Sequence, residues 1–425
     1  ALRGTQGIVH GGHPVTIALP PHASHPWFGV DGDCLTIGGR PIVELAAQAG
    51  QTPFYVYDRS VMTRKVAGLR AAFPPEVHLH YAMKANPMPA VVRHMLDLVD
   101  GLDVASAGEM QVALDAGASP ALVSFAGPGK TDSELARAAA AGITINIESE
   151  REIRVLAGIR ANTGRRARVA VRVNPDFELK TSGMKMGGGP KQFGIDAERV
   201  PEVLATIGAA ALDFQGFHIF SGSQNLRAEA IVEAQQKAVA LARRLARHAP
   251  GPVRTLNIGG GFGIPYFPEE RPLDIAPIAA ALRDLVPEVA QSMPGAQLVL
   301  ELGRYFVGES GAYVCRVIDR KISRGQVFLV CDGGLHHHLA ASGNFGQVIR
   351  KNYPVLIGNR VQGTERETAS VVGPLCTPLD LLADRMNLAH AEEGDLVVVL
   401  QSGAYGLSSS PRAFLSHPPA VELLV

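Results

Sequence analysis

The stretch His78-Leu79-His80-Tyr81-Ala82-Met83-Lys84-Ala85-Asn86 decides how the rest of this 425-residue chain is interpreted. Its alternation of side chains predicts a β-strand that ends in a lysine. The two faces are Leu79, Tyr81 and Met83 on one side and His80, Ala82 and Lys84 on the other. An ammonium group on the inward face of a strand is costly unless it is paired or used chemically. Because most lysines lie at the surface, this stretch alone does not separate a reactive lysine from an ordinary one.

Apolar, β-branched segments recur at even spacing on both sides of this strand. Eight of them are predicted as strands, at residues 77–84, 101–105, 122–126, 143–147, 168–174, 214–220, 255–259 and 297–301. Amphipathic helical patterns separate them, for example at residues 107–116, 132–141, 149–161 and 228–248. Eight strand–helix units over about 250 residues are typical of a (β/α)8 barrel. An open doubly wound sheet is the alternative, and the count of eight disfavours it.

The pattern of predicted secondary structure changes after Arg304. Short β-type segments at residues 313–318, 327–331, 369–372, 396–400 and 421–425 are joined by turns that contain glycine and proline. We therefore predict a barrel over residues 51–303 and an all-β domain made of residues 1–50 and 304–425, with the N-terminal strand around Cys34 joining the β domain. One long irregular connection, at residues 176–196, is expected to be either disordered or functional.

The composition excludes several classes of function. Lys+Arg and Asp+Glu both number 40, so no charge excess favours nucleic acid. The four cysteines are widely spread and form no CxxC pair, which disfavours a disulfide framework or a zinc site and suits a reducing compartment. No apolar run reaches membrane-spanning length, and the first residues lack the pattern of a secretory signal. We expect a cytoplasmic enzyme or binding protein without a membrane partner.

Polar and charged residues collect where the predicted strands end. In (β/α)8 barrels the reactive groups lie at the carboxyl ends of the strands. Those positions hold Lys84, Asp103, Ser106, Arg172, Asn174, His218, Ser221, Gly259 to Gly261, Glu301 and Arg304. Few such residues are expected on the buried strand ends of an inert scaffold, so a catalytic site is predicted at this end of the barrel.

The glycine-rich segment Asn257-Ile258-Gly259-Gly260-Gly261-Phe262-Gly263 is a candidate phosphate site. Successive glycines let backbone N–H groups close on an anion, and the loops after strands seven and eight commonly hold phosphate in such barrels. Tight turns also need glycine, so the segment alone is weak evidence. It lacks the lysine and hydroxyl residue of a P-loop, which disfavours nucleotide binding.

A phosphate site, a strand-end lysine, a histidine and a carboxylate together suggest pyridoxal phosphate. The aldehyde of this cofactor condenses with a lysine amine, and its ring accepts electrons when the pyridine nitrogen is protonated. Glu301 can hold that proton, and His218 can lie against the flat face of the ring. Arg304 can meet a phosphate or a substrate carboxylate.

Six motifs in order give a family resemblance. They are residues 81–86 (YAMKAN), 105–109 (ASAGE), 259–261 (GGG), 301–304 (ELGR), 373–376 (GPLC) and 402–405 (SGAY). The chain resembles the fold-type-III pyridoxal phosphate decarboxylases, the group of the diaminopimelate and ornithine decarboxylases, from about Cys34 to its end. The resemblance implies an alanine-racemase-like barrel with a β domain, pyridoxal phosphate as cofactor, and a homodimer whose active sites are shared across the interface.

The resemblance also implies a role for each matching residue. Lys84 is expected to carry the cofactor, His218 to stack on its ring and Glu301 to hold the pyridine nitrogen. The other expected cofactor contacts are Asp103, Arg172, Ser221, Gly259, Gly260, Gly261, Gly303, Arg304 and Tyr405, and the expected substrate contacts are Arg304, Thr377, Asp380 and Tyr405. Cys376 from the neighbouring subunit is expected to protonate the carbanion left after CO2 departs. The alternative for Cys376 is a small buried hydrophobe.

The sequence departs from the family where substrate is chosen. Diaminopimelate and ornithine decarboxylases place an acid directly after the cysteine, and that acid grips the distal amino group of the substrate. Here Thr377 stands in its place, although Asp380 is kept. Residues 336–338 are three histidines in place of the family pattern, for which Arg350 and Tyr353 are possible displaced counterparts. Adjacent histidines point in different directions and rarely converge on one ion, so no metal is predicted and a substrate-pocket or structural role is preferred.

Two further segments, residues 185–194 and 332–338, resemble a side branch of the family. That branch includes the butirosin-pathway enzyme that decarboxylates glutamate attached to an acyl carrier protein, and homologues associated with exosortase systems. The resemblance implies an amino-acid α-decarboxylase whose substrate is carrier-linked or otherwise derivatised, with an acyl carrier protein as a possible partner. The alternatives are meso-diaminopimelate decarboxylase, an amino-acid racemase, and a non-catalytic pyridoxal-phosphate-binding protein.

Overall fold

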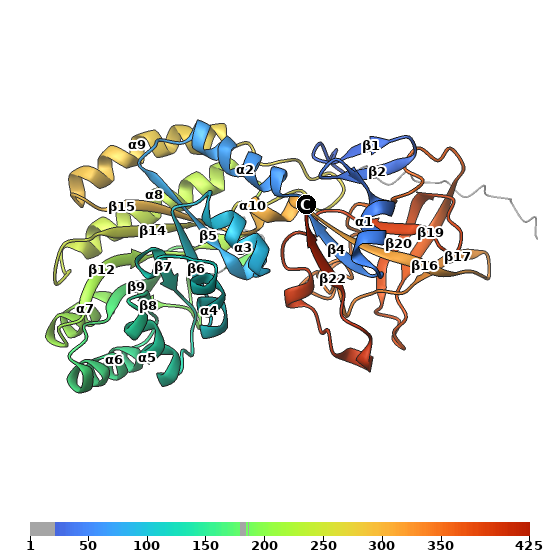
Figure 1. Ribbon diagram of the computed structural model, residues 1–425. Helices are drawn as coiled ribbons and strands as arrows, with labels where there is room; N and C mark the ends of the chain where they lie inside the picture. The colour runs from blue at the N-terminus through green and yellow to red at the C-terminus, as the bar shows by residue number, and fades with distance from the viewer. Residues whose placement is uncertain (1–21, 179–183, 186) are drawn as a thin grey trace, which may run out of the picture.

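The computed structural model describes residues 22–178, 184–185 and 187–425. It consists of a barrel and a mostly β part that lie side by side (Figure 1). Of the predicted irregular connection at residues 176–196, residues 179–183 and 186 lie outside the described residues. The rest of that connection contains only the two-residue strands β10 (Met184–Lys185) and β11 (Ile195–Asp196).

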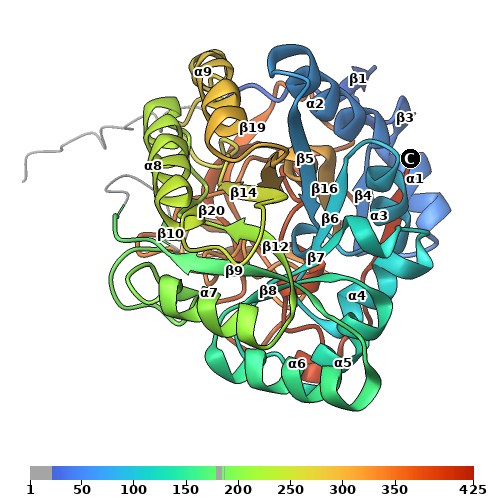
Figure 2. The same ribbon diagram turned by 90° about the vertical axis from the view of Figure 1, so that its left-hand side faces the viewer.

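All eight predicted barrel strands are confirmed. They are β5 (Val77–Ala82), β6 (Gly101–Val104), β7 (Val123–Phe125), β8 (Thr144–Ile147), β9 (Arg168–Asn174), β12 (Asp213–His218), β14 (Thr255–Gly260) and β15 (Gln297–Leu302). Every neighbouring pair is parallel, and β8 pairs with β9, which closes the sheet into a barrel. Figure 2 turns the barrel toward the viewer and shows the strands surrounded by helices. The (β/α)8 architecture expected from the spacing is therefore confirmed.

The barrel helices lie outside the strands. They are α2 (Arg59–Ala72), α3 (Pro89–Leu96), α4 (Ala107–Asp115), α5 (Asp132–Ala141), α6 (Glu150–Thr163), α7 (Val200–Ala209), α8 (Ala228–Ala246) and α9 (Ala276–Ser292). Local sequence fixes several of their ends. At α5, for example, the Thr131 side chain accepts from the Glu134 N–H while the Glu134 carboxylate accepts from the Thr131 N–H, and Gly142 ends the helix in the left-handed conformation.

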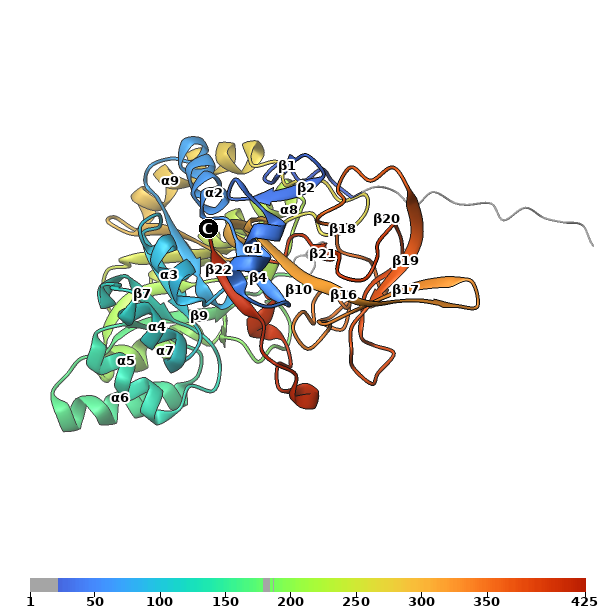
Figure 3. The ribbon, with the colours of Figure 1, turned by 45° about the vertical axis from the view of Figure 1, so that its right-hand side comes forward.

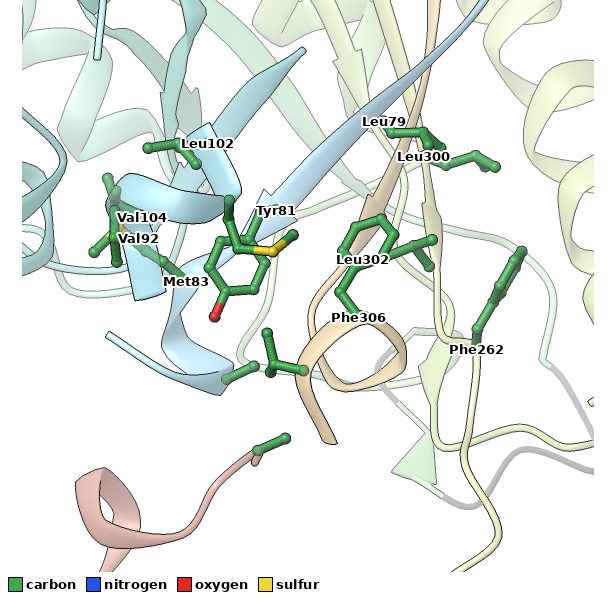
Figure 4. Close-up of a cluster of buried hydrophobic side chains, with 14 of the residues drawn as sticks. Leu79, Tyr81, Met83, Val92, Leu102, Val104, Phe262, Leu300, Leu302 and Phe306 are labelled. Atoms are coloured by element: carbon green, nitrogen blue, oxygen red, sulfur yellow. The ribbon is translucent and has the colours of Figure 1, made fainter. Parts of the chain in front are cut away.

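Strand β5 has the two faces that the sequence predicts, but it ends earlier. Leu79 and Tyr81 are buried in the hydrophobic core, next to Leu300 and Leu302 of β15 (Figure 4). The strand stops at Ala82, and Lys84 lies in the following 3-10 turn η1 (Met83–Ala85). The Tyr81 hydroxyl donates to the Asn86 backbone oxygen at 2.8 Å, which fixes this turn. Lys84 is thus carried beyond the strand end to the barrel mouth.

A second sheet forms the core of the β part. Its path is β18 (Val355–Ile357), β21 (Leu396–Val399), β16 (Gly311–Ser323), β17 (Gln326–Cys331), β19 (Arg366–Val372) and β20 (Leu381–Ala389). Strand β4 (Phe54–Tyr57) pairs with β16 and with β22 (Val421–Leu424). The β16–β17 hairpin projects away from the barrel (Figure 3). All five β segments predicted after Arg304 are present.

One detail of the predicted domain arrangement differs from the structure. Phe54–Tyr57, which the predicted limits assign to the barrel, belongs to the β-part sheet because it pairs with β16. The strand around Cys34, β2 (Cys34–Ile37), pairs with β1 (Gly29–Asp31) and β3 (Arg40–Pro41) in a separate small sheet. It still packs on the β part, because Leu35 and Ile37 share a hydrophobic cluster with Val398. We propose that the barrel domain begins at α2 and that the segments before it belong with the β domain.

The two parts meet at the turn that carries Lys84. The Tyr405 N–H donates to the Ala85 backbone oxygen at 2.8 Å, and the Asn86 side chain donates to the Gly403 backbone oxygen at 3.1 Å. A Cβ atom on Gly403 would lie 1.7 Å from the Val307 backbone oxygen, so this approach requires glycine. Val307 ends α10 (Arg304–Val307), the short helix that leads from the barrel into the β part.

Residues His336 to His338 are fully buried in the β part. Nε2 of His337 donates to the Pro418 backbone oxygen (2.8 Å), and Nε2 of His338 hydrogen-bonds to the Ser402 hydroxyl (2.9 Å). Neither ring nitrogen of His336 has a partner among the described residues. Over the described ranges, no group of three or more His, Cys, Asp or Glu side chains could hold a metal ion. In the same part of the chain, no helix is long and apolar enough to cross a membrane.

Acid is expected to destabilise the protein through these histidines. Burial lowers the pKa of His336 and of His338 from 6.5 to about 3, so both stay neutral in the folded state at pH 5, where an unfolded histidine is charged. The unfolded state therefore binds more protons between pH 6.5 and 3, and stability falls with pH through that window, by up to about 2 kcal/mol per histidine at pH 5. Melting temperatures at pH 7.5 and pH 5 measure this.

The variant His336→Phe should lose less melting temperature between the two pH values than the parent protein does. The exposed His248 is the matched control, and His248→Phe should keep the parental dependence. An equal pH dependence of the melting temperature in all three proteins would contradict the role assigned to His336.

Candidate active site

Lys84 faces a carboxylate at the barrel mouth. Its Nζ lies 3.6 Å from Oε1 of Glu301, at the end of β15, and 5.4 Å from the ring centre of Phe220. Burial would lower the pKa of the ammonium group, but the Glu301 carboxylate outweighs it and raises the pKa above its ordinary value. The Lys84 side chain keeps 42% of its surface exposed, so its amine is accessible to a ligand.

Glu301 is buried and held by several groups. Nε2 of His218 lies 2.8 Å from Glu301 Oε2, and the Asn257 side chain donates to the same oxygen at 3.5 Å. Burial alone would raise the pKa of Glu301, but Lys84 and the hydrogen bond from His218 hold it well below its ordinary value. This lowered pKa favours the carboxylate form of Glu301, which suits it to hold a protonated nitrogen.

The glycine-rich segment folds into a tight cradle. Gly259 and Gly261 have φ of +71° and +70°, which favours glycine. A Cβ atom on Gly260 would lie 2.4 Å from the Glu301 backbone oxygen, and one on Gly261 would lie 2.3 Å from that of Gly222. The absence of side chains thus lets the loop after β14 contact the loop after β12, where Ser221 lies. Such a backbone surface suits an anion.

Arg304 and Tyr405 lie beside this cradle. The Arg304 guanidinium donates to the Tyr266 hydroxyl at 2.9 Å and lies 4.5 Å from the ring centre of Tyr405. Its Nε has no partner among the described residues. A small cavity of about 20 Å³ joins these groups, and its lining includes Lys84, Ser223, Gly261, Glu301, Gly303, Arg304 and Tyr405.

Asp103 and Arg172 lie at other strand ends of the same mouth. Asp103 Oδ1 is 3.4 Å from His80 Nδ1, and its Oδ2 is buried without a partner among the described residues. Arg172 donates to Glu148 Oε1 at 2.8 Å and lies 4.9 Å from the centre of the Phe193 ring. Arg172 also lowers the pKa of Glu148 below its ordinary value, against the effect of burial. The Arg172 side chain is therefore held in place by Glu148 and Phe193.

Two strand-end residues of the prediction have local structural roles. The Ser106 hydroxyl caps α4 by accepting from the Glu109 N–H at 3.1 Å. The Asn174 side chain donates to the Gly189 backbone oxygen at 2.9 Å and accepts from the Gly188 N–H at 3.0 Å, which anchors the loop after β9.

Asn257 and Glu148 contact the site and were not identified from the sequence. Asn257 accepts from the Gly259 N–H at 2.8 Å, so one side chain links the glycine loop to Glu301. Glu148 directly follows β8, and the rule that reactive groups lie at strand ends could have found it. Asn257 is less visible, because it lies inside the predicted strand 255–259.

The segment around Cys376 is not part of the two cavities that Lys84 lines. Cys376 is exposed and Thr377 half-buried, and neither lines the cavities that Lys84 lines. Asp380 is only 3% exposed, and its two oxygens accept from the Leu335 N–H (2.6 Å) and the Leu375 N–H (2.9 Å). The structure thus gives Asp380 backbone partners in place of the predicted exposure to substrate.

A barrel whose mouth joins a lysine, a paired carboxylate, a histidine and a backbone cradle defines a class of enzyme. The donor set fits pyridoxal phosphate: an accessible amine for its aldehyde, a permanent carboxylate for its ring nitrogen, and a cradle that Cβ atoms would fill for its phosphate. The fold and the site therefore define a barrel enzyme dependent on this cofactor.

Comparison with known proteins identifies the family. The model described as "Pyridoxal-dependent decarboxylase, pyridoxal binding domain" matches residues 59–308. The chain is 38% identical over 380 residues to the L-glutamyl-[BtrI acyl-carrier protein] decarboxylase of Niallia circulans, covering 88% of this chain and 89% of the relative. It is 34% identical to the diaminopimelate decarboxylase of Aquifex aeolicus, with coverages of 93% and 91%. The chain belongs to the pyridoxal-dependent decarboxylase family.

A solved structure agrees with this assignment. Diaminopimelate decarboxylase from Helicobacter pylori, in complex with L-lysine, superimposes with a TM-score of 0.79 at 27% identity, covering 90% of this chain and 94% of that one. The predictions of family, fold, pyridoxal phosphate and decarboxylase activity are confirmed. The roles of the individual site residues and the homodimer stay predictions.

Replacing Lys84 is expected to abolish cofactor attachment. Lys84→Ala should lose the visible absorbance of the bound cofactor and at least about a thousandfold in turnover, because no other accessible amine lines the described part of the cavity beside Glu301. Absorbance spectra and CO2 release measure this. The exposed Lys321 on β16 is the control, and Lys321→Ala should behave as the parent. Unchanged absorbance in Lys84→Ala would contradict the assignment.

Proposed function

We propose that this enzyme removes the α-carboxylate of an amino acid whose side chain ends in an amide or thioester link instead of an ammonium group. The observation that carries the proposal is the segment from Gly373 to Asp380. The position that is acidic in diaminopimelate and ornithine decarboxylases is Thr377 here. A hydroxyl cannot neutralise a substrate ammonium, whose burial without a partner is costly.

Asp380 does not replace the missing acid. Both of its oxygens are engaged by the Leu335 and Leu375 backbone N–H groups, and burial raises its pKa. A Cβ atom on Gly334 or Gly373 would lie within 2.2 Å of its carboxylate oxygens, so the two glycines enclose it. We assign Asp380 the task of joining residues 333–338 to the segment that carries Cys376.

Two further findings support a derivatised substrate. The relative from Niallia circulans, at 38% identity, is named for a glutamyl group on an acyl carrier protein. A cavity of about 420 Å³ also begins at Lys84 and runs between the barrel and the C-terminal segment, lined by Asn86, Met88, Glu109, Ser408 and Arg412 among others. It gives room for a substrate larger than a free amino acid. Since the α-carboxylate must be free to leave, the link has to be at the distal carboxyl.

The residues at the barrel mouth divide the chemistry between them. Pyridoxal phosphate, when bound, supplies an aldehyde for amines and a ring that accepts the electrons of the broken bond. Lys84 presents the amine, Glu301 keeps a proton at the ring nitrogen, and His218, held by Glu301, lies where it can orient the ring. The glycine cradle and Arg304 would hold the phosphate and so orient the cofactor toward Lys84.

A proton must return to Cα after CO2 leaves, and Cys376 is the proposed donor. Cys376 is exposed and lines neither of the two cavities that Lys84 of its own chain lines, so we infer that it enters the site from a second copy. We therefore propose a homodimer in which the Cys376 of the partner subunit completes each site. An acyl carrier protein is the proposed donor of the substrate.

The substrate is tested by CO2 release with five compounds. They are the γ-L-glutamyl thioester of N-acetylcysteamine, γ-L-glutamyl-ethylamide, L-glutamate, L-ornithine and meso-diaminopimelate. We expect the two conjugates to exceed the two diamino acids at least about tenfold in kcat/KM, since Thr377 puts no carboxylate at the position after Cys376. A clear preference for meso-diaminopimelate would overturn the proposal in favour of diaminopimelate decarboxylase. D/L interconversion without CO2 release would indicate a racemase.

Thr377→Glu is the matched variant for this panel. It restores an acid at the position that decides the proposal, so it should raise kcat/KM for meso-diaminopimelate and lower that for the conjugates. Thr377 is half-buried on a loop, where its hydroxyl accepts from the Leu379 N–H at 3.3 Å, so a longer side chain can be accommodated. An unchanged ratio would show that this position does not set specificity.

A further inference from the structure

Gln235, on helix α8, is a buried amide that the site described above does not use. Its side chain is 2% exposed, and neither Nε2 nor Oε1 has a hydrogen-bond partner among the described residues. A buried primary amide without partners destabilises a folded protein, because it loses its hydrogen bonds to water. An amide retained in such a place calls for a ligand, a water or a loop that it serves.

The amide lies behind the glycine cradle. Gln235 lines a cavity of about 20 Å³ together with Ser221, Gly222, Asn225, Gly260 and Gly261. That volume is enough for one water molecule. Gly261 also lines the cavity that contains Lys84, Glu301 and Arg304. Gly261 is common to the two cavities, so Gln235 lies next to the loops of the proposed phosphate site.

The loops in front of Gln235 touch each other through their backbones. The Asn225 N–H donates to the Gly261 backbone oxygen, and the Gly263 N–H donates to the Asn225 backbone oxygen, both at 2.9 Å. Gly261 is also closely packed against Gly222, and the Asn257 side chain holds the Gly259 N–H, so the orientation of the cradle N–H groups depends on how the two loops are held together. A buried donor and acceptor behind them can fix that orientation, directly or through one water.

We propose that Gln235 is a positioning residue of the phosphate cradle: its amide holds the loops after β12 and β14 so that their N–H groups face the phosphate of pyridoxal phosphate. The inference rests on the proposed placement of the phosphate at Gly259 to Gly261. It assigns Gln235 no contact with the reacting atoms. The unfavourable free energy of burying the Gln235 amide without partners in the apoenzyme is offset when the cofactor binds.

The test compares pyridoxal phosphate with pyridoxal, which has the same ring and aldehyde but no phosphate. Dissociation constants of both are measured on the apoenzyme by absorbance and fluorescence titration, for the parent, Gln235→Leu and Gln236→Leu. Gln236 is the next residue on α8 and is exposed, so it controls for the substitution itself. We expect Gln235→Leu to weaken pyridoxal phosphate about tenfold, as for one lost hydrogen-bonded support, and pyridoxal less than twofold.

The melting temperature of the apoenzyme gives a second test, because it should not fall in the variant whose affinity for pyridoxal phosphate falls. Leucine has a similar volume and no unsatisfied polar atoms, so Gln235→Leu should keep or raise the apoenzyme melting temperature. It should also reduce the rise in melting temperature that pyridoxal phosphate produces. If Gln235 only filled the core, its replacement would not weaken the binding of pyridoxal phosphate while the apoenzyme kept its melting temperature. Inorganic phosphate should compete with pyridoxal phosphate less well in this variant.

The outcomes separate this inference from the proposed phosphate site. If the parent binds pyridoxal phosphate no more tightly than pyridoxal, the phosphate site is wrong and the inference falls with it. If the parent prefers pyridoxal phosphate but Gln235→Leu keeps the parental ratio of the two constants, the phosphate site stands and the role of Gln235 is overturned. A selective loss for pyridoxal phosphate in Gln235→Leu, absent in Gln236→Leu, supports the inference.

Discussion

The buried carboxylate of Glu301 is the constraint on which the site depends. A carboxylate that is 5% exposed is stable only when positive or donating groups surround it, and Lys84, His218 and Asn257 are those groups. They come from three other strands or strand ends, so the closed barrel is needed to bring them together. Glu301 pairs in register with His80 of β5, two residues before Ala82 ends the strand, which places Lys84 beside it. The barrel thus fixes the position of the lysine relative to the carboxylate.

The β part completes this arrangement. The segment around Gly403 and Tyr405 contacts the turn that carries Lys84, and glycines at 303 and 403 let the backbones approach. Tyr405 in turn lies against the guanidinium of Arg304. The mouth of the barrel is therefore walled on one side by residues far along the chain. The same part of the protein buries His336 and engages Asp380 with backbone amides. The segment that we propose to select the substrate therefore lies in the region that stabilises the β part.

Much of this could be predicted because the signals were local. The alternation in each strand and the helix patterns between them gave the eight strands, and the strand-end rule found Lys84, His218 and Glu301. Long-range pairing was less visible. Phe54–Tyr57 is buried at all four positions, so its pattern does not show which sheet it joins. Asp380 was predicted as a substrate contact, and the sequence does not show that the backbone N–H groups of Leu335 and Leu375 donate to its two oxygens. Gln235 looked like one polar residue on an amphipathic helix.

The central claim is that Glu301 keeps the ring nitrogen of the bound cofactor protonated. The most direct measurement is nitrogen NMR of the enzyme reconstituted with pyridoxal phosphate labelled with 15N in the ring, for the parent and Glu301→Gln. We predict a protonated ring nitrogen in the parent throughout its working pH range. We predict that Glu301→Gln loses this proton, because glutamine keeps the shape of the glutamate side chain but not its charge. An unprotonated nitrogen in the parent, or the same shift in both proteins, would contradict it.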